Sequence, residues 1–336
     1  MAKCAKRFTG LVMVLAFFMA LSVSAHALSN VPEKDIPIGS SGEAVKQLQE
    51  ALKELSFYTG EITGVYDTNT TLCVKKLQQQ LSLTVDGLFT KQTAEALNIY
   101  IDKKLDEEAA KQKPLKGYKI GIDPGHQLVP DDKYEAIAPG SSSTKERMSA
   151  GAVGAKTGTQ EYEINLLVAN KLKKKLENAG ATVVMTRTKH DVSLSNIDRA
   201  KMMNEEKVDF WLRLHADYSA DKDATGAHAI APSKLNAPQI ANNSLLLSKK
   251  ILVQFSKATG AKRNAVVIKE DQVGMNWSNA PVSTVEMGYL SNPLDDAQLN
   301  RDSYQNACAK GLYNGITAYV EETEKIAAQE RSEAER

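Results

Sequence analysis

Cysteine is scarce in this chain of 336 residues, which has only Cys4, Cys73 and Cys308. A secreted domain that depended on disulfides would show more cysteines, in an even number. Cys73 and Cys308 lie far apart along the chain, so we expect two free thiols that are buried as small apolar groups. The fold must therefore rest on hydrophobic cores.

The chain also lacks an excess of charge of either sign. It has 42 Lys and Arg residues against 41 Asp and Glu residues, for a net charge of +1. Proteins that bind nucleic acids usually show a marked excess of basic residues, so nucleic acid is not expected as a partner of this chain. Hydrophobic residues make up 42% and charged residues 25%, an ordinary globular mixture. We expect a globular monomer.

Long apolar runs are missing except near the N-terminus, which has the layout of a secretory signal peptide. Three basic residues precede an apolar run over 11–23, and Ala-His-Ala follows at 25–27. The run is shorter than the ~20 residues that a membrane span needs, which favours cleavage after Ala27 over an uncleaved anchor. Removal of residues 1–27 would change the net charge from +1 to −2, because three basic residues leave with them. We therefore expect a secreted, extracellular or wall-associated protein (periplasmic in an organism with an outer membrane) that has no membrane segment after cleavage.

Residues 36–98 contain an internal repeat. The segment Val45–Gln49 returns as Val74–Gln78, and the glycine-containing segment Ile62–Tyr66 returns as Val85–Phe89. Apolar residues recur at helical spacing in both copies, and the glycines suit tight turns. The pattern predicts a small all-α domain of about three helices.

This repeat resembles the peptidoglycan-binding domain found beside many cell-wall hydrolases. The resemblance rests on Gly39–Gly42 before the first helix and on the two glycine turns with the Thr-containing helix starts that follow them. It implies that the domain holds the protein on peptidoglycan. The alternative is a helical spacer without a ligand, since a fold does not fix a function.

Two charged segments border the main domain. Residues 99–116 contain Pro114, are followed by Gly117 and are expected to form a charged linker with some helical character, and residues 323–336 are expected to form a charged tail. Between them, residues 117–322 alternate short apolar segments with amphipathic ones, which predicts an α/β fold with a mainly parallel sheet and helices on both faces. The expected strands are 118–122, 182–185, 210–214, 265–268 and 282–285, and the expected helices are 164–176, 194–204 and 295–318.

Residues that suit a metal site follow the predicted strands. His126 comes just after the first strand and His215 just after the third, and ligand sites gather at the carboxyl ends of parallel strands. A zinc hydrolase needs a third protein ligand, and Glu161 and Glu163 stand at the start of a helix. Taken alone, these two acids read equally well as helix N-terminal charges. Glu286 ends an apolar strand and would face the same crevice, where a carboxylate can act as a base.

These segments together resemble the zinc-dependent N-acetylmuramoyl-L-alanine amidases of bacterial cell walls. The matching motifs are Ile122–His126, Glu161–Leu166, Leu214–Asp217 and Val285–Asn292, in this order, with Met185–Arg187 and Leu194–Arg199 between them. The resemblance implies one Zn²⁺ held by His126, Glu161 and His215, with Glu286 as the catalytic carboxylate. It implies hydrolysis of the amide between N-acetylmuramic acid and L-alanine of the peptidoglycan stem peptide.

Several alternatives stay open at this point. Glu163 is the rival of Glu161, while His190 and His228 are not expected to be ligands. The same donor set also suits iron(II). The protein could instead be a zinc peptidase acting within the stem peptide, or an inactive peptidoglycan-binding protein. The long polar segment 127–160 is either a substrate-contacting element or a disordered insertion.

Overall fold

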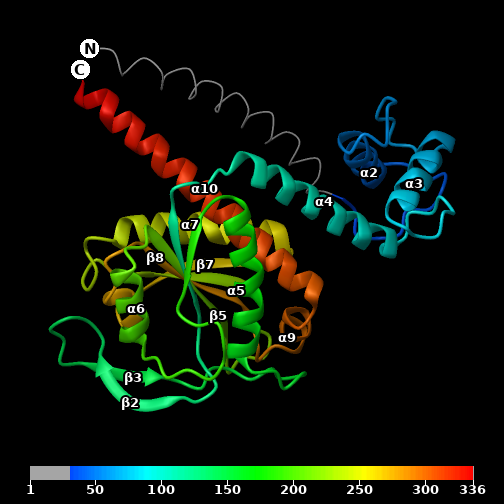
Figure 1. Ribbon diagram of the computed structural model, residues 1–336. Helices are drawn as coiled ribbons and strands as arrows, with labels where there is room; N and C mark the ends of the chain where they lie inside the picture. Colours follow the sequence, from blue (N-terminus) through cyan, green and yellow to red (C-terminus); the bar gives the residue numbers. More distant parts are fainter. Residues whose placement is uncertain (1–30, 336) are drawn as a thin grey trace. The chain divides into compact units, whose positions relative to one another are not determined.

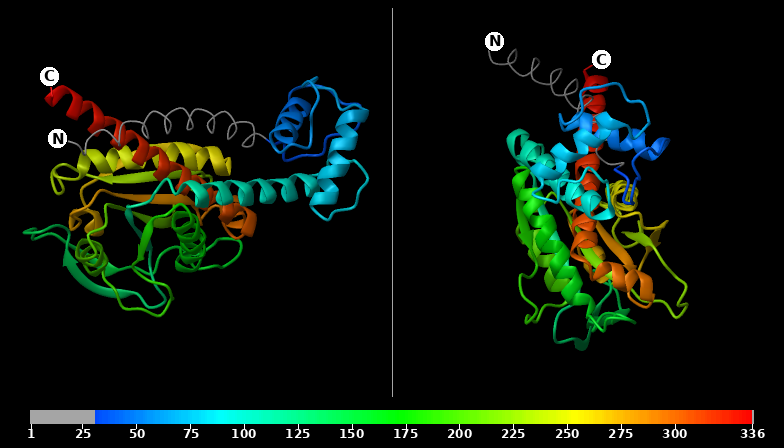
Figure 2. Two further views of the ribbon diagram at one scale, coloured as in Figure 1. Left: turned by 45° about the horizontal axis from the view of Figure 1, so that its top comes forward. Right: turned by 90° about the vertical axis from the view of Figure 1, so that its right-hand side faces the viewer.

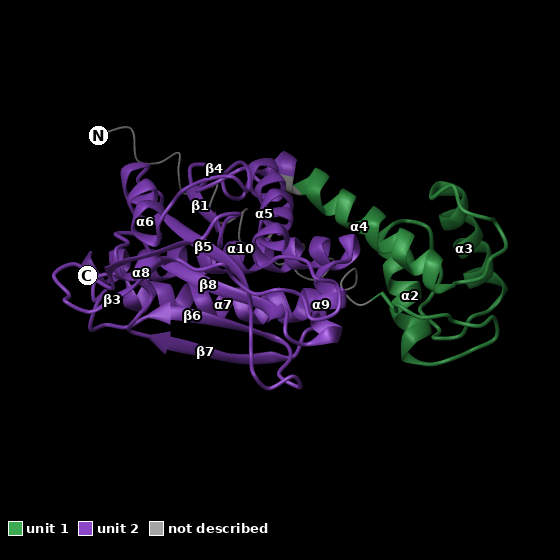
Figure 3. Ribbon diagram, turned by 90° about the horizontal axis from the view of Figure 1, so that it is seen from below, with its two compact units in different colours: residues 1–108 green, residues 109–336 purple. Residues whose placement is uncertain are grey.

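The computed structural model describes residues 31–335, which fall into two compact units (Figures 1 and 3). The smaller unit comprises Met1–Glu108 and the larger unit Ala109–Arg336. Each has its own hydrophobic core. The predicted signal peptide lies outside the described residues. None of the helices within 31–335 is both long and apolar enough to span a bilayer.

The smaller unit is helical, as predicted. Its helices are α2 (Glu43–Glu54), α3 (Thr68–Gln80) and α4 (Lys91–Gln112), of which residues 109–112 fall in the larger unit. The α4 helix is continuous across residue 99, so most of the segment expected to be a linker is the second half of this helix. The run lacks the proline or glycine that would end a helix before Pro114.

The repeat in the smaller unit has a physical basis in two glutamines. The side chain of Gln49 accepts a hydrogen bond from the backbone N–H of Gly64 and donates one to the carbonyl of Val65. Gln78 makes the same pair of bonds with the second turn, at Gly87 and Leu88. Each helix thus fixes a turn whose glycine has a positive φ, of 69° and 81°.

The larger unit is built on a six-stranded sheet in the order β4-β1-β5-β8-β6-β7. The strands β4, β1, β5 and β8 are parallel to one another, as predicted, and β6 and β7 run in the opposite direction. The bounds are β1 (Lys119–Pro124), β4 (Thr182–Met185), β5 (Phe210–Asp217), β6 (Ala227–Pro232), β7 (Arg263–Lys269) and β8 (Val282–Tyr289). A separate antiparallel hairpin pairs β2 (Asp131–Ala136) with β3 (Thr144–Met148).

Helices cover both faces of the sheet, as predicted (Figures 1 and 2). One face packs on α5, α7 and α10, and the other packs on α6 and α8. The bounds are α5 (Glu161–Asn178), α6 (Asn196–Glu205), α7 (Ala241–Thr259), α8 (Val273–Asn276), α9 (Pro293–Leu299) and α10 (Asp302–Ala334). The single helix expected over 295–318 is therefore two, because the chain breaks helical geometry at Arg301, whose φ is −90° and ψ 133°. The tail expected from residue 323 continues α10.

Gly315 lies where α10 packs against α7. A Cβ atom there would come within 2.6 Å of the Cα of Ile251. We expect Gly315→Ala to lower the free energy of unfolding by up to about 2 kcal/mol, because an overpacking cost of about 1–3 kcal/mol outweighs the ~1 kcal/mol that alanine gains in helix propensity. Urea denaturation would measure it, with Asn314→Ala on the same helix as the control. Equal stability of both variants would show that the two helices separate at little cost.

Candidate metal centre

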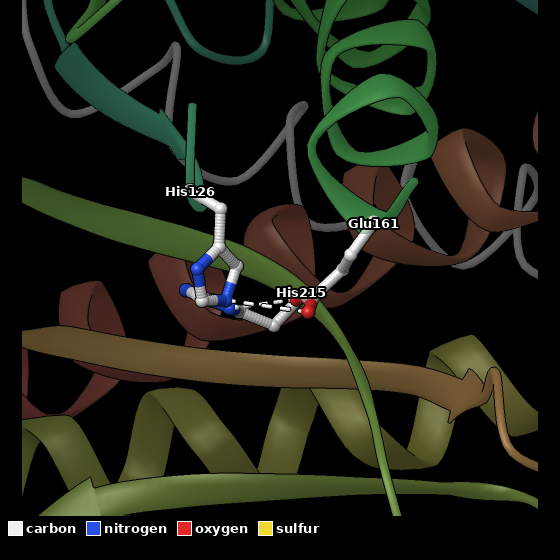
Figure 4. Close-up of side chains that lie close together, drawn as sticks. All are labelled: His126, Glu161 and His215. Carbon is white, nitrogen blue, oxygen red and sulfur yellow. Dashed lines mark hydrogen bonds and ion pairs between the residues drawn. The ribbon is translucent and has the colours of Figure 1, made fainter. Parts of the chain in front are cut away.

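Three side chains from distant parts of the sequence meet at the carboxyl edge of the parallel strands (Figure 4). His126 follows β1, Glu161 begins α5 and His215 lies near the end of β5. Each offers one ligand atom, and these atoms all lie within 4.8 Å of one another. A carboxylate oxygen of Glu161 is 3.3 Å from Nε2 of His126, and the other is 2.9 Å from Nδ1 of His215. The cluster predicted from the sequence is thus present.

Glu161 is held by backbone donors on both sides. Its two oxygens accept hydrogen bonds from the N–H groups of Ala152, at 2.8 Å, and Ala216, at 3.1 Å. The amide of Asn165, one helical turn later, donates a third at 3.3 Å. Glu163 instead accepts from the backbone N–H of Gln160 in a capping box, and so stabilises the start of α5. The structure therefore brings Glu161, and not its rival, to the histidines.

His126 sits in an unusual backbone conformation, with a φ of 59°. Left-handed geometry in a residue other than glycine costs energy and concentrates at functional sites. Its Nδ1 is 2.9 Å from the carbonyl of Ser149 and donates to it, which leaves Nε2 facing the other two side chains. Gly125 and Gly151 leave space for the two imidazole rings. A Cβ atom at Gly125 would clash with the ring of His215, and a Cβ atom at Gly151 would lie 2.9 Å from the ring of His126.

The charges in the cluster are strongly coupled. Burial would raise the pKa of Glu161, but the two imidazoles outweigh burial and hold that pKa well below its usual range. Burial lowers the pKa of His126, yet the carboxylate of Glu161 more than offsets it, and the pKa is raised. For His215 burial dominates and the pKa is lowered. The cluster thus holds one ionised carboxylate against two imidazoles, an arrangement that suits a bound cation.

A buried ionic network supports the backbone on which His126 stands. Asp123, at the end of β1, pairs with Arg199 at 2.6 Å and with Arg213 at 2.9 Å. Arg199 also donates to the carbonyl of His126, and Arg187 donates to the carbonyls of residues 124 and 125. Arg187 and Arg199 end the segments Met185–Arg187 and Leu194–Arg199, which the sequence indicated only as framework between the site motifs. They fix the turn that carries the first histidine.

Asp123→Asn should therefore be strongly destabilising. Burial alone would raise the pKa of Asp123, but the two guanidinium groups outweigh it and lower the pKa well below its usual range. A lowered pKa gives stability that is present above the unfolded value of about 3.9 and is lost as the pH falls below it. We expect the free energy of unfolding at pH 7 to fall by about 3–5 kcal/mol, because two buried guanidinium groups lose their negatively charged partner.

The measurement is urea denaturation of both proteins between pH 3 and pH 7. The difference in the free energy of unfolding should shrink as the pH falls below about 4, because Asp123 of the unfolded wild-type chain takes up a proton there while the folded carboxylate stays ionised. A difference that stayed constant across this range would rule out the ionised form as the source of the stability.

Glu286 lies on β8 directly beside β5, where its Cα is the register partner of His215. Its side chain is 8% exposed, and its Oε2 atom is buried without a hydrogen-bond partner. Burial, and then the negative charges of Glu161 and Asp217, raise the pKa of Glu286 well above its usual value. A carboxyl group with a raised pKa can both accept and donate a proton near neutral pH.

The long segment 127–160 is ordered along much of its length and carries the β2–β3 hairpin. Trp277 and Asn276 donate hydrogen bonds to the carbonyls of Ala136 and Ile137, and Glu135 accepts bonds from the start of α6. The alternative of a disordered insertion is therefore wrong. Contact with substrate remains a prediction. Among residues 31–335, the group of side chains that could hold a metal ion consists of His126, Glu161 and His215, and it does not include His190 or His228.

The donor set fits a metal ion. Two imidazoles and one carboxylate with an open side are typical of catalytic zinc sites, and the same set also suits iron(II). Two of the three donors, His126 and Glu161, are oriented by further hydrogen bonds to the backbone, which is characteristic of metal ligands.

Two family profiles match the chain. Residues 120–318 match that of the N-acetylmuramoyl-L-alanine amidase family, and residues 41–97 match that described as "Putative peptidoglycan binding domain". Among curated relatives, N-acetylmuramoyl-L-alanine amidase LytC of Bacillus subtilis is 24% identical over 61% of this chain and 36% of its own length. "Probable cell wall amidase LytH" of Staphylococcus saprophyticus is 29% identical over 67% of this chain and 65% of its own. The matches thus span less than two thirds of these two relatives.

Solved structures share the fold. The N-acetylmuramyl-L-alanine amidase Ami1 of Mycobacterium smegmatis covers 62% of this chain and 99% of its own, with a TM-score of 0.56 and 22% identity. An N-acetylmuramoyl-L-alanine amidase of Clostridium difficile 630 covers 61% of this chain and 97% of its own, with a TM-score of 0.51 and 23% identity. At this level of identity the likeness concerns the fold alone.

Proposed function

Because this chain belongs to the N-acetylmuramoyl-L-alanine amidase family, we propose that it is a secreted cell-wall hydrolase that cleaves the amide between N-acetylmuramic acid and L-alanine in peptidoglycan. The observation that carries the proposal is the convergence of His126, Glu161 and His215 beside Glu286. Three metal-ligating groups and one proton-transferring carboxyl are the parts that metal-assisted amide hydrolysis requires.

We propose Zn²⁺ as the metal, held by His126, Glu161 and His215. When bound, this ion would activate a water molecule and polarise the scissile carbonyl. Glu286 accepts the proton of the attacking water and then donates it to the leaving nitrogen, for which its raised pKa is suited. The water supplies OH to the carbonyl carbon and H to the nitrogen, so no covalent enzyme intermediate is needed.

Analysis of the products from purified peptidoglycan tests this proposal. The expected products are glycan strands with free lactyl carboxylates and stem peptides with a new N-terminal L-alanine. New termini between amino acids of the stem would instead identify a peptidase. Metal analysis of the same preparation should give one zinc ion per chain, and stoichiometric iron would replace zinc in the proposal.

We further propose that the smaller unit holds the enzyme on its insoluble substrate, because residues 41–97 match a peptidoglycan-binding profile. A protein without residues 28–113 should be retained less by insoluble peptidoglycan and should digest it more slowly, since tethering raises the local concentration of enzyme. Its kcat on a soluble muramoyl-peptide should stay at the full-length value, because the two units have separate cores. If the shortened protein lost the same fraction of its rate on insoluble peptidoglycan and on the soluble substrate, the targeting role would be rejected.

A further inference from the structure

A second histidine flanks Glu286 on the side away from the candidate metal ligands. The Cα of Glu286 on β8 has two register partners, His215 on β5 and His228 on β6. Side chains directly opposite in an antiparallel pair have Cβ atoms about 4.5–5.5 Å apart. The three side chains thus form a row across three strands, with Glu286 in the middle. His228, which the sequence analysis did not expect to be a metal ligand, is therefore a close neighbour of the proposed proton-transferring group.

A break in strand register brings two more polar groups to His228. The pairing of β5 with β8 shifts between His215 and Asp217, so that Asp217 is the partner of Tyr289. Glu286 and Tyr289 are three residues apart and would face opposite sides in a regular strand, but the shift returns Tyr289 to the side of Glu286. The ring of Tyr289 stacks on His228 at 5.8 Å, and Asp217 lies 3.6 Å from Nε2 of His228.

The polar atoms of this cluster are only loosely satisfied within the chain. The hydroxyl of Tyr289 is 3.4 Å from Nδ1 of His228, and both contacts of the imidazole are longer than an ordinary hydrogen bond. His228 is only 7% exposed, and Oε2 of Glu286 next to it is buried without a partner. Buried polar groups are usually hydrogen-bonded, so these atoms suit a ligand that supplies the missing bonds.

The chemistry of the cluster matches a peptide. Burial lowers the pKa of His228, although the charge of Asp217 acts in the opposite sense, and the lowered pKa favours the neutral imidazole. A neutral imidazole offers one donor and one acceptor, which are complementary to the C=O and N–H of a peptide group. The carboxylate of Asp217 favours an amino group that becomes cationic after cleavage.

We propose that His228, together with Asp217 and Tyr289, binds the stem peptide on the leaving-group side of the scissile amide. This inference rests on the proposed function. Glu286 must reach the leaving nitrogen in order to protonate it, whereas the scissile carbonyl belongs beside His126, Glu161 and His215. The peptide that continues from this nitrogen therefore extends past Glu286 toward His228.

Steady-state kinetics on a soluble muramoyl-peptide test the inference, with inhibition by each half of the substrate as the decisive readout. In His228→Ala we expect a KM raised roughly five- to tenfold, as for the loss of a buried hydrogen bond. Inhibition by the released stem peptide should weaken by a similar factor, and inhibition by N-acetylmuramic acid should stay unchanged. His228→Gln should recover part of the loss. His190→Ala, which removes a histidine packed on Tyr162, should keep the wild-type KM.

Metal content and thermal unfolding of each variant separate this role from a structural one. If His228→Ala binds less metal, or if both inhibitors weaken equally, the inference is overturned, and so it is if KM and peptide inhibition stay at wild-type values. Tyr289→Phe removes one hydroxyl and gives the same test should the alanine variant fail to fold. A wild-type chain that releases no stem peptide from peptidoglycan would overturn the proposed function itself, whereas the outcomes above leave that function standing.

Discussion

Glu286→Gln will lower kcat by about 10²–10⁴-fold while the metal content stays at the wild-type value. Glutamine has the shape of glutamate but accepts no proton at its side-chain oxygen under these conditions. The residue neighbours His215 through strand register and is absent from the group of three possible ligands found among the described residues. Its loss should therefore affect the chemical step and leave the metal in place. Initial rates on a soluble muramoyl-peptide, with metal analysis of the same sample, measure both.

Glu205→Gln provides the matched control, because Glu205 is an exposed acid at the end of α6 in the same unit. This variant should keep the wild-type kcat. If Glu286→Gln retained more than about a tenth of the wild-type rate, another group would have to transfer the proton, and the role of Glu286 would be lost.

Glu161→Gln should remove the metal and the activity together. The carboxylate lies between two imidazoles and accepts two backbone N–H bonds, so an amide there would place an NH₂ group against donors as well as lose a charged ligand. We expect the affinity for zinc to fall more than about 100-fold, beyond the usual effect of changing a partner outside the ligand shell. Metal titration of the purified protein, followed by rates at saturating zinc, measures the change.

Glu163→Gln stands two residues further along α5 and is the control for that experiment. Its side chain caps the helix, and glutamine can do the same, so metal binding and rate should be unchanged. If both variants bound zinc equally well, Glu161 would be no ligand. If only Glu163→Gln lost the metal, the order of the two acids would have to be reversed.

The site was predictable because its residues stand at strand and helix ends. His126 and His215 each follow a short apolar segment, and the carboxyl ends of parallel strands converge. Glu161 could not be separated from Glu163 by periodicity, since both are acids in a first helical turn. The resemblance to known amidases favoured Glu161 over Glu163. The hydrogen bonds explain this preference, because Glu161 accepts hydrogen bonds from the backbone N–H groups of Ala152 and Ala216.

What escaped prediction depends on contacts between distant residues. The hairpin strand Asp131–Ala136 reads as a polar loop, and it is held by donors from Asn276 and Trp277, about 140 positions away. The strand β6 consists mostly of small residues and ends in proline, so it lacks the usual β-branched signal. Its reversed direction placed His228 beside Glu286, and no local pattern carries that information.

Each of the two units contains one buried thiol whose reactivity can report on the opening of that unit. Cys73 is buried in the smaller unit and Cys308 in the larger one, and both are unpaired. Burial raises the pKa of Cys308, so a thiol reagent modifies it only when the surrounding helices open. Pulse labelling of the chain from residue 28 onward, followed by peptide mapping, would therefore yield two separate opening rates. Loosening of the smaller unit could then be distinguished from loosening of the larger unit without adding a probe.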